Sequence, residues 1–192
     1  GAGTSSGYIQ NVNVLSSTGA GNLYFGQKVE SANSASLNGK SVTISFVIAH
    51  DYGSNLNVFI VLDKPTLKDN FGALANIGTS PAKVATSGAY TKISQTFTLS
   101  ASDATYGLDV KVYFSVPAGM TSKNFYAGDI QLEEGSIATP FEQRPIGLEL
   151  SLCQRYYSTG NLAFLNQTNA VASVGGNTRY PMTMRSTPTI TL

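Results

Sequence analysis

Charged residues, cysteine, histidine and tryptophan are all scarce in this chain of 192 residues. Charged side chains make up 12% of it, well below the roughly 25% of an ordinary globular domain. The 12 lysines and arginines do not cluster and the net charge is +1, so the basic surface of a nucleic-acid-binding protein is missing. The single cysteine, Cys153, excludes an internal disulfide and favours assembly in a reducing cytoplasm.

Long apolar runs are missing as well. The longest, such as residues 58–62, are far shorter than the roughly 20 residues that cross a bilayer as a helix, so we expect no membrane insertion. No signal-peptide pattern stands at the beginning. The chain starts Gly-Ala-Gly without Met and ends in strand-like residues 189–192, so we expect it to be cut from a longer polypeptide.

Alternation of apolar and polar side chains is the dominant pattern. The clearest segments are residues 42–48, 56–62, 93–99 and 108–116, and weaker ones are residues 8–14, 23–29 and 125–132. A period of two residues predicts half-buried β-strands, and many strands separated by turn residues predict an antiparallel sandwich or barrel. The predicted core contains Ile44, Phe46, Val58, Ile60, Phe97, Val110, Val112 and Phe114.

The segment 64–89 breaks this pattern and contains Pro and Gly, so we expect a long connection at the rim with a short helical turn near residues 71–75. Composition changes again at residues 140–145. We predict one domain over residues 1–145 and the incomplete start of a C-terminal β module over residues 146–192. A short helix after Pro145 is expected to bury Leu148, Leu152 and Cys153, because it must cover apolar surface. Further short strands are predicted at residues 162–165, 170–174, 180–184 and 189–192.

Several segments resemble parts of one class of protein. Residues 128–145, GDIQLEEGSIATPFEQRP, resemble the closing strand of carbohydrate-binding-module-like jelly rolls, an ending that phage structural proteins often use. Residues 148–157, LELSLCQRYY, are similar to the junction that follows it in bacteriophage tail-fibre and other virion appendage proteins. Residues 39–46, GKSVTISF, resemble a strand of the same jelly rolls, and residues 180–189 resemble the β module that follows.

The resemblance implies an all-β fold: an antiparallel jelly-roll β-sandwich followed by a short helix and part of a second small β module. Phe141 is then expected to plug the open end of the sandwich. The implied function is structural, as part of a phage tail fibre or tail appendage at or near the host-binding end. The implied partners are identical subunits in a homotrimer, other virion tail proteins and a host cell-surface glycan. Such a protein is synthesised in the host bacterial cytoplasm and resides in the virion.

Two other functions stay open. One is a carbohydrate-binding module appended to a glycan-degrading enzyme, which would be monomeric and bind a glycan alone. The other is a head-decoration or baseplate protein that uses the same fold.

Catalytic and metal sites find little support in the sequence. His50 and Asp51 are adjacent, but neighbouring residues of a strand point to opposite faces, so they do not form a base and its orienting carboxylate. The same reasoning separates Glu133 from Glu134, whereas glycoside hydrolysis needs two facing carboxyl groups. Asp129 and Glu142 supply too few oxygens for calcium. We therefore predict a protein that is not an enzyme, with no catalytic residue, metal or cofactor.

Exposed aromatic and polar side chains are the remaining candidates for binding. Asp109, Lys111 and Tyr113 are predicted to project from one strand, away from the core. Tyr52, Asn55 and Tyr106 are predicted to lie on loops. These six residues are the candidate ligand-binding residues. They could contact a saccharide or pack against a neighbouring subunit, and the absence of tryptophan favours subunit packing.

Overall fold

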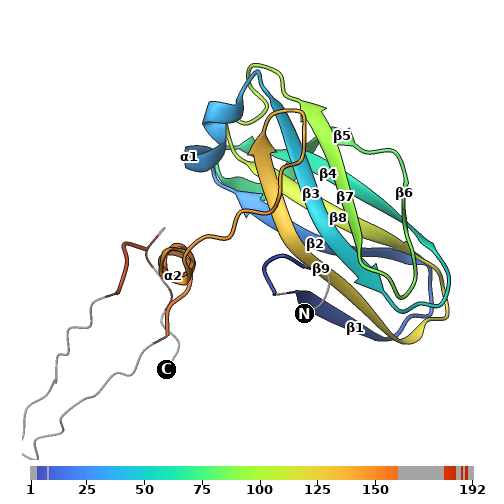
Figure 1. The fold of residues 1–192 in the computed structure, drawn as a ribbon. Helices are drawn as coiled ribbons and strands as arrows, with labels where there is room; N and C mark the ends of the chain where they lie inside the picture. The colour runs from blue at the N-terminus through green and yellow to red at the C-terminus, as the bar shows by residue number, and fades with distance from the viewer. Residues whose placement is uncertain (1–3, 8, 160–179, 185–186, 188, 190–192) are drawn as a thin grey trace, which may run out of the picture. The chain divides into compact units, whose positions relative to one another are not determined.

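The computed structural model describes residues 4–7, 9–159, 180–184, 187 and 189. The chain divides into two compact units, Gly1–Glu142 and Gln143–Leu192 (Figure 1). The first unit holds every β-strand of the described residues, and the second holds one helix.

Nine strands build the first unit. They are β1 (Gln10–Ser16), β2 (Gly21–Val29), β3 (Ser41–His50), β4 (Leu56–Leu67), β5 (Asn70–Thr79), β6 (Lys83–Ala85), β7 (Thr91–Thr98), β8 (Leu108–Val116) and β9 (Thr121–Glu134). Sheet A has the order β1-β9-β3-β7, and sheet B has the order β2-β8-β4-β5, with β6 also paired to β4. Every pairing is antiparallel. The strands β1 to β4 alternate between the two sheets, and so do β7 to β9, which gives the jelly-roll topology that was predicted.

The core lies between the two sheets, as alternation requires. All eight predicted core residues are buried, and Ile44, Val58, Ile60, Val112 and Phe114 have no exposed surface. A short helix, α1 (Ser31–Ser34), and a 3₁₀ turn (Ala35–Leu37) connect β2 to β3 at one end of the sandwich. The sequence therefore predicted the architecture and its core correctly.

The segment after Lys64 differs from expectation. It forms the end of β4, a tight turn and the whole of β5, so the predicted helical turn near residues 71–75 is wrong. Asp69 adopts a positive φ of 55° in the turn, which brings Leu67 opposite Asn70. The alternation is weak here because β5 is an edge strand with glycine and alanine along it. Pairing with β4 decides its conformation, and this pairing is a tertiary effect that local sequence does not show.

Residues 135–142, which we call the strap, turn back across the outer face of sheet A. Thr43 Oγ1 donates a hydrogen bond to the carbonyl of Gly135 (2.8 Å), and Lys92 Nζ donates to the carbonyl of Thr139 (3.1 Å). The carboxylate of Glu133 accepts hydrogen bonds from the amide and hydroxyl of Thr139, at 2.8 and 2.6 Å. The strap thus covers a face that alternation alone would leave to solvent.

This cover explains why Thr43, Ser45 and Val47 are buried although they point away from the core. It also corrects the expectation for Phe141, which lies beside Val47 and Asp129 on the outer face of sheet A and does not plug an end of the sandwich. The reason is that hydrogen bonds from β3, β7 and β9 hold the strap along the sheet.

The helix after Pro145 forms as predicted, as α2 (Ile146–Gln154). Its predicted burial is wrong, because Leu148 and Leu152 are 51% and 42% exposed and Cys153 is exposed too. The apolar side chains of α2 stand at every second position from Ile146 to Leu152. In a helix of 3.6 residues per turn this spacing places Ile146 and Leu150 on one side and Leu148 and Leu152 on the roughly opposite side. The apolar side chains are therefore divided between two faces, and neither face is buried.

The C-terminal β module stays a prediction. Residues 180–184 form bends and no strand, which contradicts the strand expected there. The expected strands at residues 162–165 and 170–174 lie outside the described residues, as does most of 189–192. Within the described part of the chain, no helix has the length and apolar character to cross a membrane.

Gly107 provides a test of how β5 is held against the rest of sheet B. Its φ is +121°, and a Cβ atom there would lie 2.9 Å from the carbonyl oxygen of Val29 and 3.0 Å from Cζ of Phe71. Gly88 also has a positive φ, of +75°, but has open space around it. We expect Gly88→Ala to cost about 1 kcal/mol of unfolding free energy through backbone strain alone. Gly107→Ala adds a clash, and we expect at least about 1 kcal/mol more in urea unfolding.

Equal losses for the two glycine variants would show that the backbone of β2 and the ring of Phe71 move aside freely, which would contradict this packing.

Candidate functional site

Three aromatic side chains form a row across the outer face of sheet B. Tyr24 on β2 pairs with Tyr113 on β8, and Tyr113 pairs with Phe59 on β4. The ring centroids of Tyr24 and Tyr113 are 5.5 Å apart, and those of Tyr113 and Phe59 are 5.0 Å apart in a stacked arrangement. Their immediate neighbours, such as Phe25 and Phe114, point into the core, so the three rings must face outward. We call these residues the aromatic row.

A charged cluster lies beside the aromatic row on the same face. Lys111 is two residues from Tyr113 on β8, and its Nζ pairs with the carboxylates of Asp63 and Asp109. Asp63 and Asp109 stand directly opposite each other on β4 and β8. Asn76 on β5 donates a hydrogen bond from Nδ2 to Asp63 Oδ1 (2.7 Å). We call these four residues the polar cluster.

Lys111 makes the pairing of two aspartates tolerable. Like charges directly opposite in a sheet repel each other, but here the ammonium group stands between them. Burial works to lower the pKa of Lys111, but the hydrogen bond to Asp63 and the charges of Asp109 and Asp63 outweigh it and raise the pKa. The ammonium therefore stays charged and fixed, and it holds the carboxylate oxygens in place next to the aromatic rings.

The six sequence-predicted site residues do not form one site. Asp109, Lys111 and Tyr113 lie together on the outer face of sheet B, as their alternation indicates. Tyr52 and Asn55 lie in the loop between β3 and β4, at one end of β8, and Tyr106 precedes its other end. The nine residues of β8 separate these loops by about 25 Å. Tyr52 is also partly buried against the core, so only part of its ring is available to a ligand.

Sequence reasoning missed Tyr24 and Phe59. Both alternate with buried residues in segments that were recognised as strands, so their outward direction was predictable. Their alignment with Tyr113 was not, because it depends on which strands are neighbours and on the register between them.

His50 and Asp51, the pair considered for catalysis, make separate contacts in the structure. His50 is 1% exposed, lies between Phe114 and Phe125, and has Nε2 3.0 Å from the carbonyl of Ala85. The amide of Tyr52 donates to its Nδ1 (3.3 Å), which fits the tautomer with hydrogen on Nε2. Asp51 instead accepts hydrogen bonds from Asn124 at the surface. The imidazole is a core residue with both nitrogens in use.

The acidic candidates are used structurally. Glu133 binds the strap, while Glu134 pairs with Lys40 at 2.7 Å. Asp129 accepts hydrogen bonds from the amides of Ser5 and Ser6, and Glu142 lies exposed at the end of the strap. In the described residues no group of three or more His, Cys, Asp or Glu is placed to hold a metal ion.

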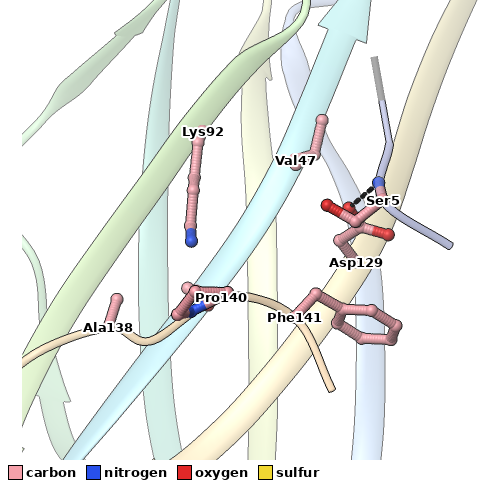
Figure 2. A pocket seen from close by; sticks show the side chains of 8 residues that line it. Ser5, Val47, Lys92, Asp129, Ala138, Pro140 and Phe141 are labelled. Atoms are coloured by element: carbon pink, nitrogen blue, oxygen red, sulfur yellow. Dashed lines mark hydrogen bonds between the residues drawn. The ribbon is translucent and has the colours of Figure 1, made fainter. Parts of the chain in front are cut away.

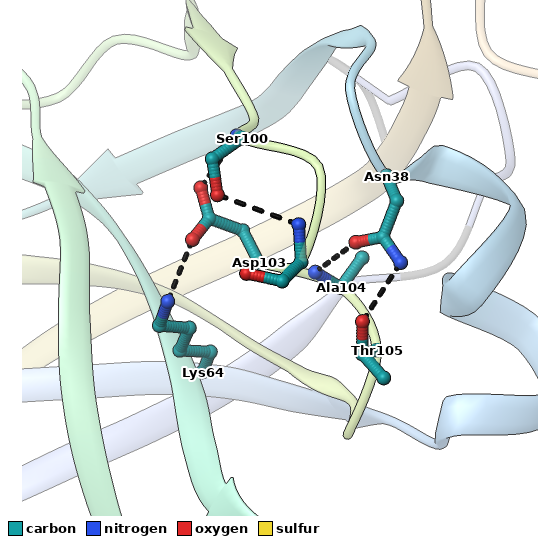
Figure 3. Close-up of polar contacts among 7 residues, drawn as sticks. Asn38, Lys64, Ser100, Asp103, Ala104 and Thr105 are labelled. Atoms are coloured by element: carbon teal, nitrogen blue, oxygen red, sulfur yellow. Dashed lines mark hydrogen bonds and ion pairs between the residues drawn. The ribbon is translucent and has the colours of Figure 1, made fainter.

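A hydrogen-bonded network fixes the loop that leads into β8 (Figure 3). Asp103 accepts hydrogen bonds from Lys64 Nζ and from the amide of Ser100, both at 2.7 Å. The side chain of Asn38 accepts a hydrogen bond from the amide of Ala104 (2.7 Å) and donates one to Thr105 Oγ1 (2.9 Å). These contacts anchor the start of the strand that carries Asp109, Lys111 and Tyr113.

No family model matches the chain, and no curated protein matches its sequence. Several solved structures are similar to it at low identity. The N-terminal cellulose-binding domain of a β-1,4-glucanase from Cellulomonas fimi is 14% identical, with 71% of this chain and 88% of that one covered and a TM-score of 0.41. The CBM22-2 xylan-binding domain from Paenibacillus barcinonensis is 16% identical, with 67% and 89% covered and a TM-score of 0.38. A carbohydrate-binding module of the β-sandwich superfamily is 15% identical, with 69% and 59% covered and a TM-score of 0.43.

At these identities and TM-scores the likeness transfers no function to this chain. Its function has to be inferred from its own side chains.

The network around Asp103 predicts how stability depends on pH. Burial works to raise the pKa of Asp103, but hydrogen bonds from Lys64 and Ser100 outweigh it and hold the pKa below its ordinary value of 3.8. A carboxyl group whose pKa is lower in the folded state stabilises the fold above its unfolded pKa. We expect this contribution to be complete above about pH 5 and to be lost as the pH falls through the lower, folded value.

Asp103→Asn keeps the size of the side chain but removes its charge. We expect it to lower the unfolding free energy at neutral pH by about 1–3 kcal/mol, and the difference from the unsubstituted protein to shrink in acid. Glu142→Gln, at an exposed carboxylate, is the matched control and leaves the free energy nearly unchanged. A constant difference between Asp103→Asn and the unsubstituted protein from pH 7 down to about pH 2 would contradict the assignment.

Proposed function

We propose that the sandwich is a non-catalytic module that binds a glycan on the outer face of sheet B. The aromatic row beside the polar cluster is the observation that carries this proposal. A sugar ring has an apolar face of C–H groups, which packs against aromatic rings, and an edge of hydroxyl groups, which hydrogen-bond to fixed polar atoms. Tyr24, at 55% exposed, offers the most open ring surface of the row.

The geometry favours a neutral, extended glycan. The aromatic row crosses three strands, a span of about 10 Å, so its rings can contact successive sugars of one chain. In the polar cluster one ammonium group stands between two carboxylates, which leaves a single net negative charge. Lys28 stands opposite Asp109 on β2 and offsets this charge, so the face has no net charge with which to attract an acidic glycan. Neutral hydroxyl groups can donate to the carboxylate oxygens.

Substitutions in the aromatic row test the glycan proposal. We expect the full chain to bind a neutral oligosaccharide, such as xylohexaose or cellohexaose, in isothermal titration with a Kd of about 10 μM to 1 mM. Tyr113→Ala removes the central ring, and Tyr24→Ala removes the most exposed one. Each is expected to weaken binding by about tenfold or more.

Tyr90→Ala is the matched control, because Tyr90 is an exposed tyrosine outside the aromatic row. Equal loss of affinity in Tyr90→Ala, or no binding of any neutral oligosaccharide by the folded protein, would refute the assignment.

We further propose that this module belongs to a bacteriophage tail fibre or tail appendage, near its host-binding end. The support is the resemblance of residues 128–145 and 148–157 to such proteins. In this role the glycan is on the host cell surface, the partners are other virion tail proteins, and the protein is made in the host bacterial cytoplasm before it joins the virion. The alternative is a carbohydrate-binding module appended to a glycan-degrading enzyme.

The helix α2 supports the fibre role over the appended module. Ile146, Leu148, Leu150 and Leu152 are each 42–80% exposed and lie on two opposite sides of the helix. Apolar side chains on opposite sides call for cover on both sides, and a single partner can cover only one of them. In a homotrimer around one axis, neighbouring copies can cover this helix.

Solution mass distinguishes the two functions. We expect the full chain to form a trimer at micromolar concentration, as measured by light scattering or native mass spectrometry. The double substitution Leu148→Asp with Leu152→Asp places charges on α2 and is expected to shift the mass toward the monomer. Leu15→Asp, at a leucine that is 75% exposed on β1, is the control and leaves the mass unchanged. A stable monomer of the unsubstituted chain would favour the appended sugar-binding module.

A further inference from the structure

The strap and sheet A enclose a hollow of about 430 Å³ between them (Figure 2). Val47 and Ser45 of β3 and Lys92 of β7 line it on the sheet, and Pro140 and Phe141 line it on the strap. Asp129 of β9 and Ser5, near the N-terminus, complete the wall. This hollow lies on the opposite sheet from the aromatic row, and nothing in the glycan proposal depends on it.

The backbone is distorted to place Asp129 in this wall. Between Ser45 and Val47 the register of β3 and β9 shifts, so that Phe46 faces two residues of β9, Asp129 and Ile130. Asp129 adopts a φ of +46°, which is uncommon for any residue other than glycine. Such β-bulges re-aim a side chain and occur often next to functional sites. Here the bulge turns the carboxylate outward onto the outer face of sheet A.

The hydroxyl group of Ser45 is a second feature of the hollow that no contact within the described protein uses. Ser45 is 2% exposed and lines the hollow, yet its hydroxyl group has no hydrogen-bond partner among the residues that the structure describes. The oxygen of this hydroxyl group keeps accessible surface on the hollow, where water or a ligand can hydrogen-bond to it. Its neighbours on the same face, such as Thr43, are matched by the strap.

Lys92 keeps unused hydrogen-bonding capacity in the hollow. Its Nζ makes one hydrogen bond, to the carbonyl of Thr139, and an ammonium group has three donors. Asp129 is already engaged, because its carboxylate accepts the amides of Ser5 and Ser6 and side-chain hydrogen bonds from the same two serines. The hollow therefore offers free donors from Lys92 together with the hydroxyl group of Ser45.

Lys92 and Asp129 both have partners within the protein, which favours a neutral ligand. Burial works to raise the pKa of Asp129, but hydrogen bonds from Ser6 and Ser5 outweigh it and lower the pKa. Burial likewise works to raise the pKa of Glu133, but hydrogen bonds from Thr139 and the charge of Lys92 lower it, so Lys92 has a neighbouring carboxylate. A zwitterion gains little from charged groups that are engaged in this way. A neutral molecule with several hydroxyl groups can instead accept from Lys92 and pair with the hydroxyl of Ser45.

We propose that the hollow under the strap binds one neutral sugar ring. The apolar face of the ring packs against Phe141, which forms one side of the hollow with Pro140 (Figure 2). One of its hydroxyl groups accepts a hydrogen bond from Lys92, and another pairs with the hydroxyl of Ser45 on the sheet. This is a second sugar site, separate from the aromatic row, and its volume is sufficient for a single sugar ring.

Backbone amide resonances of the full chain locate such binding directly. We would titrate the ¹⁵N-labelled protein with D-glucose, D-galactose, D-mannose and N-acetyl-D-glucosamine, and with L-alanine as a zwitterionic probe. We expect at least one sugar to cause saturable shifts of the amides of Ser45, Val47 and Asp129, with a Kd of about 1–10 mM. L-alanine is expected to cause none.

Two variants remove different parts of the site. Ser45→Val removes the hydroxyl group and Phe141→Ala removes the stacking ring, and each is expected to weaken binding by about fivefold or more. Ser16→Val, at an exposed serine on β1, is the matched control for a serine-to-valine change in a strand of sheet A. Thermal melting confirms that each variant is folded before it is titrated.

The outcomes separate this proposal from the glycan proposal on sheet B. Saturable shifts that survive in Tyr113→Ala and Ser16→Val but are weakened in Ser45→Val and Phe141→Ala support the hollow. Loss of the same shifts in Tyr113→Ala would assign them to the aromatic row and overturn it. Shifts with L-alanine alone, or none with any sugar up to about 50 mM, would overturn it as well.

Discussion

The alternation of side chains along β8 determines which residues lie on each face of sheet B. Val110, Val112 and Phe114 are buried in the core, and this commits Asp109, Lys111 and Tyr113 to the opposite face. A slip of one residue in its pairing would move every apolar side chain to solvent, so the register is strongly specified. The aromatic row and the polar cluster exist because β2 and β4 align with β8 in that register. The core therefore fixes which side chains of β8 belong to the candidate binding face.

The two outer faces of the sandwich are used differently. The strap covers the outer face of sheet A, where it satisfies Thr43, Thr96 and Lys92 by hydrogen bonds to its carbonyl groups. On sheet B the aromatic row remains partly exposed, and its charged neighbours pair with one another. Few charged residues are available in the chain, and those on this face are held in fixed positions. Such a face suits recognition, because its side chains lose little freedom when a ligand binds.

Alternation in the sequence was enough to predict the strands, the core and the outward direction of Asp109, Lys111 and Tyr113. It could not predict that Tyr24 and Phe59 join Tyr113, because register between distant strands is a property of the whole sheet. It misread β5, whose conformation depends on pairing with β4. It also predicted burial for Leu148 and Leu152 on the assumption that α2 has one apolar face, whereas Ile146 and Leu150 lie on the opposite side of the helix from them.

Asp129 has a consequence for how the sandwich bears mechanical load. It ties the amides of Ser5 and Ser6 to β9, and Phe141 lies in the same part of sheet A, so the chain enters and leaves the sandwich at one patch. Tension applied through both ends acts first on these few hydrogen bonds, and it would peel the first residues and the strap from the sheet one bond at a time. The paired strands of the core lie behind this patch and would be loaded only after it has opened.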